Sequence, residues 1–169
     1  ARDISRCLGG FSSKQGYYES DNFLLSWSFG HLVEIAAPEI EGGKWTPEQL
    51  PLFPQFILRV TERGQEQFAV LKTLMHQADS LINACDAGRE GELIFRYLCL
   101  AAGCQKPVQR LWISSLTAES IRAGFQNLLK SNDFDDLYLA GKCRNEADWI
   151  VGINATRTFS IVQRTLFSV

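Results

Sequence analysis

Acidic side chains, glycines and one arginine are concentrated in a single short segment, residues 81–96 (LINACDAGREGELIFR). An apolar run leads into a glycine-bearing turn and then into a helix-like pattern, which is the arrangement at which open α/β sheets bind ligands. We therefore expect Asp86, Glu90 and Glu92 to crowd together at one edge of a sheet. Such carboxylates repel one another unless some are protonated or a cation lies between them, and oxygen-only ligands suit Mg²⁺ better than zinc.

Other residues of this segment favour phosphate chemistry. Arg89 suits a phosphate partner, and Gly88 and Gly91 allow a tight turn that a bulky polyanion can approach. The segment thus predicts Mg²⁺-assisted phosphoryl transfer on a nucleotide or nucleic acid. A Walker A loop and a dinucleotide-binding loop do not fit, because the first needs Gly-Lys-Ser/Thr and the second a glycine trio. The remaining alternative is a helix N-terminus whose acidic residues favour the helix dipole while the arginine makes ordinary surface pairs.

Residues 86–92 (DAGREGE) resemble the Asp-x-Asp-x-Glu signature of Toprim domains, in the form carried by type IA DNA topoisomerases. Gly88 stands where that family has its second aspartate, which removes one carboxylate from the metal site. More segments resemble the same family in the same order, and the match is closest to the topoisomerase III branch. These segments are Gly30-His31-Leu32 with Glu34, Trp45 before Leu50-Pro51, and residues 144–157 (RNEADWIVGINATR).

The resemblance implies a reaction and roles for residues. One DNA strand is cleaved by a tyrosine that lies outside this chain, another strand passes through, and the break is religated without ATP. Asp86 and Glu90 would bind Mg²⁺, and Glu90 would also hold or donate a proton near the leaving 3′-oxygen. Arg89 would neutralise the scissile phosphate, and His31 would lie near the active centre. Taken alone, His31 is more typical of a structural histidine, since no cysteine or histidine is spaced to bind zinc with it.

The resemblance also implies contacts with single-stranded DNA. Arg157 and Arg164 would bind phosphates, Trp149 would lie beside a sugar or base, Trp45 would stack on a base or touch the strand, and Arg144 and Asp148 would also contact DNA. At about 100° per residue, Arg157 and Arg164 nearly align on a straight helix, whereas Arg144 and Asp148 lie roughly opposite. A bend near Gly152 would bring them together; otherwise Arg144 and Asp148 face the acidic site. The alternative is an amphipathic helix with an Arg144–Asp148 pair and a core tryptophan.

Alternating strand and helix patterns predict an α/β fold, with a parallel sheet flanked by helices. We expect a Toprim domain at residues 1–132 and the start of a helical DNA-binding domain at residues 133–169. The family's first strand ends in a glutamate that this chain lacks, so we interpret the chain as an internal piece of a longer protein. The predicted helices cover residues 2–8, 66–78, 92–102, 118–129 and 134–162, and Thr117 is expected to open the helix at 118–129. The predicted strands cover 56–60, 80–85 and 111–114, a hairpin covers 17–29, and a surface loop covers 38–54.

Composition limits the classes of partner. The net charge of −2 argues against a general polyanion binder, so contact with nucleic acid must come from local positive charge. Five cysteines without a Cys-x-x-Cys pair suggest neither a zinc ribbon nor disulfides. We expect a cytoplasmic, bacterial-type protein associated with the nucleoid or a plasmid, with no membrane contact, whose partners are single-stranded DNA and the remainder of its own polypeptide, including the tyrosine domain. The competing interpretations are a Toprim hydrolase or primase and a non-catalytic DNA-binding module.

Overall fold

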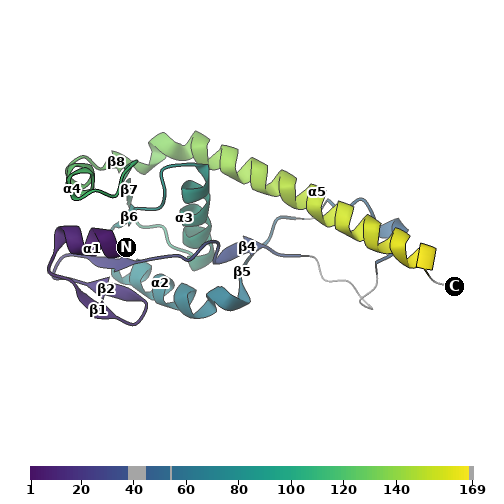
Figure 1. Ribbon diagram of the computed structural model, residues 1–169, viewed down its shortest axis with the longest axis horizontal. Coiled ribbons are helices and arrows are strands. Elements are labelled where there is room, and N and C mark those ends of the chain that lie inside the picture. Colours follow the sequence, from purple (N-terminus) through teal and green to yellow (C-terminus); the bar gives the residue numbers. More distant parts are fainter. Residues whose placement is uncertain (38–44, 54, 168–169) are drawn as a thin grey trace.

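The chain forms a body of short strands and helices from which one long helix extends (Figure 1). The computed structural model describes residues 1–37, 45–53 and 55–167, with side chains described as far as residue 163. Short 3₁₀ turns occur at Pro47–Gln49, Glu62–Gly64 and Ser131–Phe134. The helices and strands are α1 (Arg2–Leu8), β1 (Ser12–Lys14), β2 (Tyr17–Glu19), β3 (Leu24–Ser26), β4 (Val33–Ile35), β5 (Leu58–Val60), α2 (Gln65–Gln77), β6 (Leu81–Asn83), α3 (Arg89–Ala102), β7 (Val108–Arg110), α4 (Ala118–Gln126), β8 (Leu129–Lys130) and α5 (Asp135–Phe167).

The strands form small sheets whose pairings confirm the predicted α/β class. β1, β2 and β3 form an antiparallel meander, and β4 pairs antiparallel with β5. The sheet beside the acidic segment has the order β6-β7-β8, with β6 and β7 parallel and β8 antiparallel to β7. In this register Arg110 lies opposite Asn83. The last residue of β7 is therefore placed at the end of the strand that leads into the acidic turn.

One edge of β6 is free of any strand in the described part of the chain. The amide of Leu81 donates to Pro107 O at 2.8 Å, and the amide of Leu111 donates to Asn83 O at 3.0 Å. Residues 81 and 83 thus direct their backbone polar groups toward β7. Because these directions alternate along a strand, the backbone polar groups of Ile82 point to the opposite edge.

The main hydrophobic core lies between helices α2 and α3 and strands β4 and β6. Apolar residues of α3 recur at helical spacing and bury one face of that helix, while its other side meets α5. A smaller cluster of Ile4, Leu111 and Ile121 packs under α1 and α4. The main buried cluster consists of Leu32, Val33, Phe68, Leu71, Met75, Leu81, Leu93, Phe95, Tyr97, Leu98 and Ala102.

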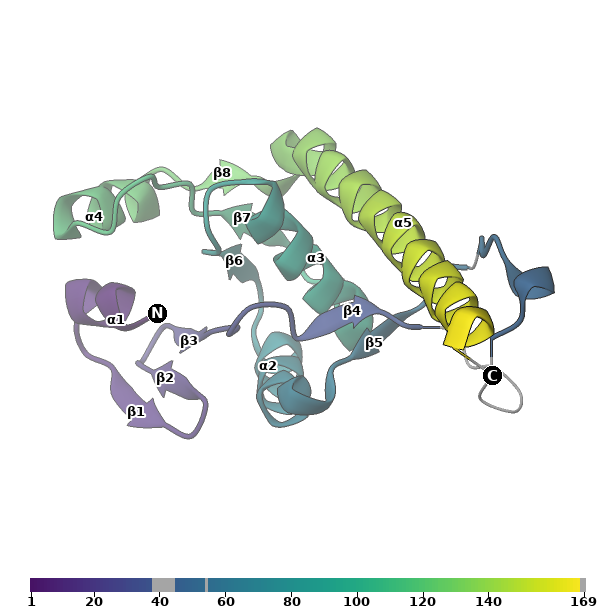
Figure 2. The same ribbon diagram turned by 45° about the vertical axis from the view of Figure 1, so that its right-hand side comes forward.

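Helix α5 is continuous from Asp135 to Phe167 and passes Gly152 without interruption. Its first half packs against α3, and its second half runs out past β4 and β5, as Figure 2 shows. Polar contacts fix the first half: Arg96 Nη2 donates to Asp135 Oδ1 at 2.7 Å, and Asn145 Nδ2 donates to Tyr97 Oη at 3.3 Å. The helix is continuous at Gly152, so it lacks the break that would have brought Arg144 and Asp148 to the same surface as Arg157 and Arg164.

Several element boundaries differ from the prediction. α3 begins at Arg89, three residues before the predicted start, so Arg89 and Glu90 belong to its first turn. β7 ends at Arg110, just before the strand predicted at residues 111–114. β1 and β4 were not predicted, because strands of three residues carry too short a pattern to identify. Thr117 caps α4 as expected, and its side chain accepts a hydrogen bond from the amide of Ser120 at 3.3 Å.

Within the described residues, no helix is both long enough and apolar enough to cross a membrane.

Candidate active site

The acidic segment forms a tight turn between β6 and α3 whose shape depends on Gly91. A Cβ atom at position 91 would lie 2.1 Å from the carbonyl oxygen of Asp86, far inside any normal contact distance. The first turn of α3 therefore packs directly on the backbone of the preceding turn. Gly88 differs, because its backbone is extended (φ 172°) and a Cβ atom there would meet nothing within 4 Å.

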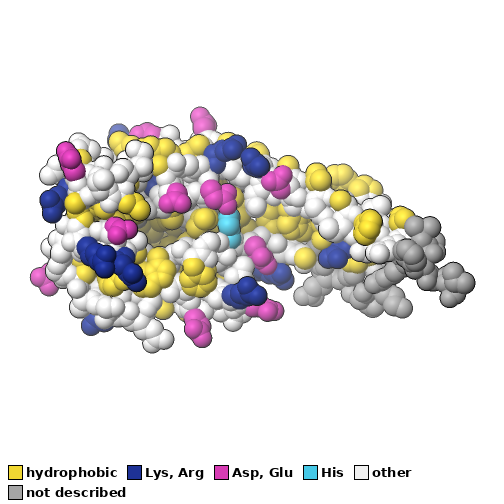
Figure 3. All heavy atoms as spheres, in the orientation of Figure 1, with side chains coloured by type: hydrophobic (Ala, Val, Ile, Leu, Met, Phe, Trp, Pro, Cys, Tyr) yellow, Lys and Arg dark blue, Asp and Glu magenta, His cyan; other side chains and the backbone are white. Residues whose placement is uncertain are grey.

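Two carboxylates of this segment, those of Asp86 and Glu90, are exposed at the start of α3 and line one cavity. The structure also brings His31 to this place, because His31 Nε2 contacts Glu90 Oε1 across 59 residues of sequence. His31 and Glu90 are thus in contact at the beginning of α3, and Asp86 lines the same cavity as Glu90. On the face of the molecule in Figure 3, acidic side chains surround the exposed histidine beside a hollow lined by apolar side chains.

The third carboxylate, that of Glu92, turns into the protein, so the expectation that Asp86, Glu90 and Glu92 crowd together is wrong. Its side chain is 1% exposed, and its Oε1 lies 2.6 Å from Arg110 Nε. The same oxygen accepts a hydrogen bond from Asn83 Nδ2 at 3.0 Å. The physical reason is helical periodicity, since two residues at about 100° each separate Glu90 and Glu92 by about 200° around α3.

Arg110 is the functional neighbour that sequence reasoning missed. Its guanidinium is buried and donates to the carbonyl oxygens of Cys85 and Asp86, each at 2.7 Å. Burial lowers the pKa of this guanidinium, whereas the carboxylate of Glu92 raises it. An arginine directly before the apolar residues 111–113 was the available signal, but the predicted strand began at residue 111, one residue too late to include it.

Cys85 lies beside Asp86, but its thiol is not suited to act as a nucleophile or metal ligand. Burial is the main cause that raises the pKa of its thiol to about 11. The thiol therefore stays protonated at neutral pH, whereas a nucleophile or metal ligand must be a thiolate. Asp86 and Glu90 remain the exposed carboxylates of this turn.

The residues present fit Mg²⁺ in chemistry and in number. No group of three or more histidine, cysteine, aspartate or glutamate side chains in the described part of the chain could hold a metal ion. A pair of exposed carboxylates is nevertheless a sufficient protein contribution for Mg²⁺, which keeps several of its waters and binds through one or two carboxylates plus substrate phosphates. Asp86 and Glu90 supply that pair.

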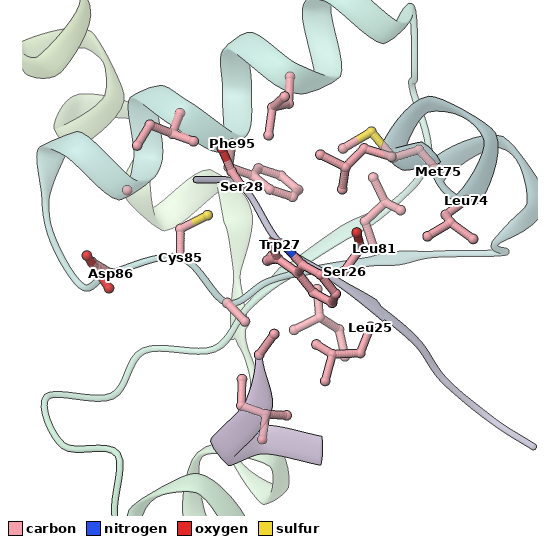
Figure 4. Close-up of a pocket in the computed structure, with 18 of the residues that line it drawn as sticks. Leu25, Ser26, Trp27, Ser28, Leu74, Met75, Leu81, Cys85, Asp86 and Phe95 are labelled. Atoms are coloured by element: carbon pink, nitrogen blue, oxygen red, sulfur yellow. The ribbon is translucent and has the colours of Figure 1, made fainter. Parts of the chain in front are cut away.

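The cavity beside the turn has a volume of about 440 Å³ and mainly apolar walls. Figure 4 shows Leu25, Trp27, Leu81 and Phe95 around this space, with Asp86 at its margin. Ile82 and Ala84 also line it, so the free edge of β6 faces the cavity. The acidic residues and an unpaired strand edge thus share one opening.

Helix α5 approaches the acidic segment through Gly141. A Cβ atom at position 141 would lie 2.9 Å from the carbonyl oxygen of Arg89, so the two helices touch backbone to backbone there. Arg144 and Asp148 lie three and seven residues further on, along the same side of α5. Both side chains are mostly exposed and pair within the helix, with Arg144 Nε 3.5 Å from Asp148 Oδ2. This is the intrahelical pair of the alternative interpretation, placed on the side that meets Arg89.

The remaining predicted DNA contacts lie on another side of α5, against the segment before β5. The Arg157 guanidinium lies 5.1 Å from the centre of the Trp45 ring, and the Trp149 ring meets Phe56 edge to face at 6.2 Å. Asn154 fixes this segment, since its amide group both accepts from the amide of Leu52 at 2.6 Å and donates to Leu52 O at 3.0 Å.

One predicted DNA contact cannot be placed. The side chain of Arg164 lies outside the described residues.

Replacing Gly91 by alanine should destabilise the protein by about 3 kcal/mol, at the upper end of the usual cost of overpacking, because the new methyl group would overlap a backbone carbonyl. The matched change Gly88→Ala, in the same turn but facing open space, should alter the free energy of unfolding by less than about 1 kcal/mol. Urea unfolding of both variants measures the difference. Equal stabilities would show that α3 does not pack on Asp86 as described.

Comparison with known proteins identifies the family of the chain. The Toprim domain family matches residues 1–116. The chain is 42% identical over 166 residues to DNA topoisomerase 3 of Staphylococcus aureus strain USA300 and 42% identical over 165 residues to DNA topoisomerase 3 of Bacillus licheniformis. These alignments cover 95% and 94% of this chain but only 23% of each relative, so the chain spans less than a quarter of their length. The resemblance to the topoisomerase III branch is thereby confirmed, and the chain belongs to the Toprim domain family.

Proposed function

We propose that this chain is the acidic, metal-binding part of a type IA DNA topoisomerase, an isomerase that cuts, passes and religates single DNA strands without ATP. The observation that supports it best is the exposed pair Asp86 and Glu90 at the start of α3, in a chain 42% identical over 95% of its length to proteins named DNA topoisomerase 3. The nucleophilic tyrosine lies outside this chain in our proposal. The protein acts in the bacterial cytoplasm, on the nucleoid or a plasmid.

The exposed residues divide the chemistry among themselves. Asp86 and Glu90 would hold Mg²⁺, which when bound neutralises and orients phosphate oxygens. Glu90 holds or donates a proton at the leaving 3′-oxygen, and His31, in contact with its carboxylate, orients it. Arg89, exposed as the first residue of α3, neutralises the scissile phosphate.

Single-stranded DNA is the substrate that we assign to α5. The stacked Arg157 and Trp45 offer a cation and an aromatic face at one place, and a nucleobase could take the ring while the guanidinium moves to a phosphate. Trp149 extends this aromatic surface. Arg144 and Asp148, on the side that meets Arg89, serve the strand near the acidic site, and Arg164 remains a proposed phosphate contact.

The remainder of the polypeptide completes the fold in this proposal. A strand from it would pair with the free edge of β6 and fill the cavity of about 440 Å³, bringing the glutamate that the family resemblance implies. Apolar walls and the outward-directed backbone groups of Ile82 support such a strand. We keep residues 1–132 as the Toprim domain and residues 133–169 as the start of a helical DNA-binding domain.

In the full-length protein, relaxation of negatively supercoiled plasmid should require Mg²⁺ but no ATP. Glu90→Gln should slow it on the order of a hundredfold, as expected for loss of a general acid. Asp86→Asn should abolish the response to Mg²⁺, whereas Asp79→Asn, an exposed change in the loop before β6, should leave the rate unchanged. Strand hydrolysis or primer synthesis without a change in linking number would instead identify a Toprim hydrolase or primase.

Gly88→Asp should tighten Mg²⁺ binding, because it restores the carboxylate of the family signature at a position with open space around the Cβ atom. Aspartate at this position, the N-cap of α3, would also stabilise the helix, so Gly88→Asn is the matched control that caps without adding charge. Isothermal titration with MgCl₂ distinguishes the two. Equal affinities of the aspartate, asparagine and wild-type proteins would contradict the prediction.

Single-stranded oligonucleotide should quench the tryptophan fluorescence of this chain more strongly than duplex does at low salt. Trp45→Phe and Trp149→Phe should each reduce the quenching, since both rings lie on the proposed DNA surface. Trp112→Phe is the control, because Trp112 stacks on Phe134 with ring centres 4.8 Å apart and has no proposed contact with DNA. Quenching that depends only on Trp112, or equally on duplex, would remove this surface from the proposal.

A further inference from the structure

One buried arginine, Arg110, donates several hydrogen bonds to the backbone of the acidic turn. The proposed chemistry gives this residue no role. Arg110 is 1% exposed, and its Nη1 donates to the carbonyl oxygens of Asn83 at 3.0 Å, Cys85 at 2.7 Å and Leu111 at 2.8 Å. Its Nη2 donates to the carbonyl oxygen of Asp86 at 2.7 Å. Every carbonyl that it reaches at the end of β6 belongs to the backbone that carries the candidate metal ligand.

We propose that Arg110 is a positioning residue that sets where the Asp86 carboxylate lies and thereby the affinity of this turn for Mg²⁺. The inference rests on the proposed function and deepens it. Arg110 itself touches neither metal nor DNA in this proposal, because its guanidinium is enclosed. It acts by holding the main chain of residues 83–86.

The shape of the guanidinium explains why an arginine is required. A planar fork with donors in fixed directions can hold several carbonyl oxygens at once, whereas an ammonium group is a compact charge on a flexible stem. The register of β7 beside β6 places Arg110 opposite Asn83, so the fork reaches around the end of β6 into the turn. Lysine at position 110 would keep the charge but could not hold the carbonyl oxygens of Cys85 and Asp86 together.

Neighbouring groups hold the guanidinium in turn. Glu92 Oε1 lies 2.6 Å from Arg110 Nε as an ion pair rather than an aligned hydrogen bond, and the Trp112 ring lies 5.0 Å away. Glu92 is on α3, two residues from Glu90. The same network therefore fixes the rotation of the helix that carries one ligand and the position of the turn that carries the other.

The close approach of Gly91 adds a second constraint on Asp86. The Asp86 carbonyl oxygen accepts from Arg110 while the first turn of α3 packs against it at Gly91. This peptide group has little freedom to rotate, so the carboxylate begins from a fixed backbone. Metal sites lose about 10–100-fold in affinity when groups that orient their ligands are removed, and we expect a loss of this size here.

The test compares Arg110→Lys with Arg96→Lys in the full-length protein. Arg96 is the matched control, because its Nε lies 3.7 Å from Glu92 Oε2 and its Nη2 donates to Asp135 and to Ser131 O, while within the described residues its hydrogen bonds and ion pairs do not reach residues 83–86. The readouts are Mg²⁺ affinity by isothermal titration with MgCl₂, binding of single-stranded oligonucleotide in EDTA, and unfolding without metal. Arg110→Lys should raise the Mg²⁺ dissociation constant about tenfold or more with oligonucleotide binding unchanged, and Arg96→Lys should leave both unchanged.

The possible results separate the inference from the function on which it rests. If Asp86→Asn removes Mg²⁺ binding but Arg110→Lys binds like Arg96→Lys, the positioning role is wrong and the metal site stands. If Asp86→Asn binds Mg²⁺ like the wild type, the proposed metal site itself is wrong. Should Arg110→Lys fail to fold, Glu92→Gln removes the countercharge while leaving the carbonyl contacts possible; it should weaken Mg²⁺ binding by a smaller factor, and unchanged affinity would overturn the inference.

Discussion

The ion pair between Glu92 and Arg110 is the interaction on which the acidic site depends. Both side chains are 1% exposed, so neither charge can be satisfied by water. Removing one partner of such a pair leaves an uncompensated buried charge, at a cost of about 3–5 kcal/mol. The pair connects β7 to α3, and Asn83 adds β6 through its hydrogen bond to the same carboxylate oxygen. Three elements that meet around the site are thus held by one charge network.

Close backbone packing extends this rigidity from the turn to the long helix. Gly91 lets α3 rest on the Asp86 carbonyl, and Gly141 lets α5 rest on the Arg89 carbonyl. A glycine inside a helix costs about 0.5–1 kcal/mol relative to alanine, so its presence in α5 is explained by the close approach and not by helix stability. A shift of α5 along α3 would therefore press on the residue next to Glu90. In the proposed function, this contact would mechanically connect DNA binding on α5 to the acidic residues of α3.

Long periodic elements and local signals could be predicted from the sequence. The helix at residues 66–78 matches α2 closely, and Thr117 was recognised as the cap of α4. The exposed pair of Arg144 and Asp148 follows from their spacing of four residues, as the alternative interpretation stated.

Contacts between distant segments could not be predicted in this way. Trp45 contacts Arg157, and Trp149 contacts Phe56. These pairs form only because the segment before β5 packs against α5, which is a tertiary contact that the local sequence does not indicate. Arg110 was missed because β7 is only three residues long and the strand predicted at residues 111–114 begins one residue after β7 ends. The burial of Glu92 was not predicted, because the helix was expected to begin at residue 92. With Glu90 outside the predicted helix, the opposite orientation of the two side chains could not be deduced.

Glu90 and Glu92 lie on opposite sides of α3, and this explains why two glutamates of one short motif have different environments. Glu90 stays in water at the opening, where it can exchange a proton or bind a cation, and Glu92 is withdrawn from solvent to neutralise Arg110. A glutamate at position 91 or 93 could do neither, because position 91 is closed by the Asp86 carbonyl and position 93 is a buried leucine of the core. The sequence Glu-Gly-Glu is therefore the arrangement that allows one charge outside, one charge inside and backbone contact between them. Gly88 lies beyond this constraint, in open space on an extended backbone, so a carboxylate can be added or lost at that position without disturbing the Arg110–Glu92 network.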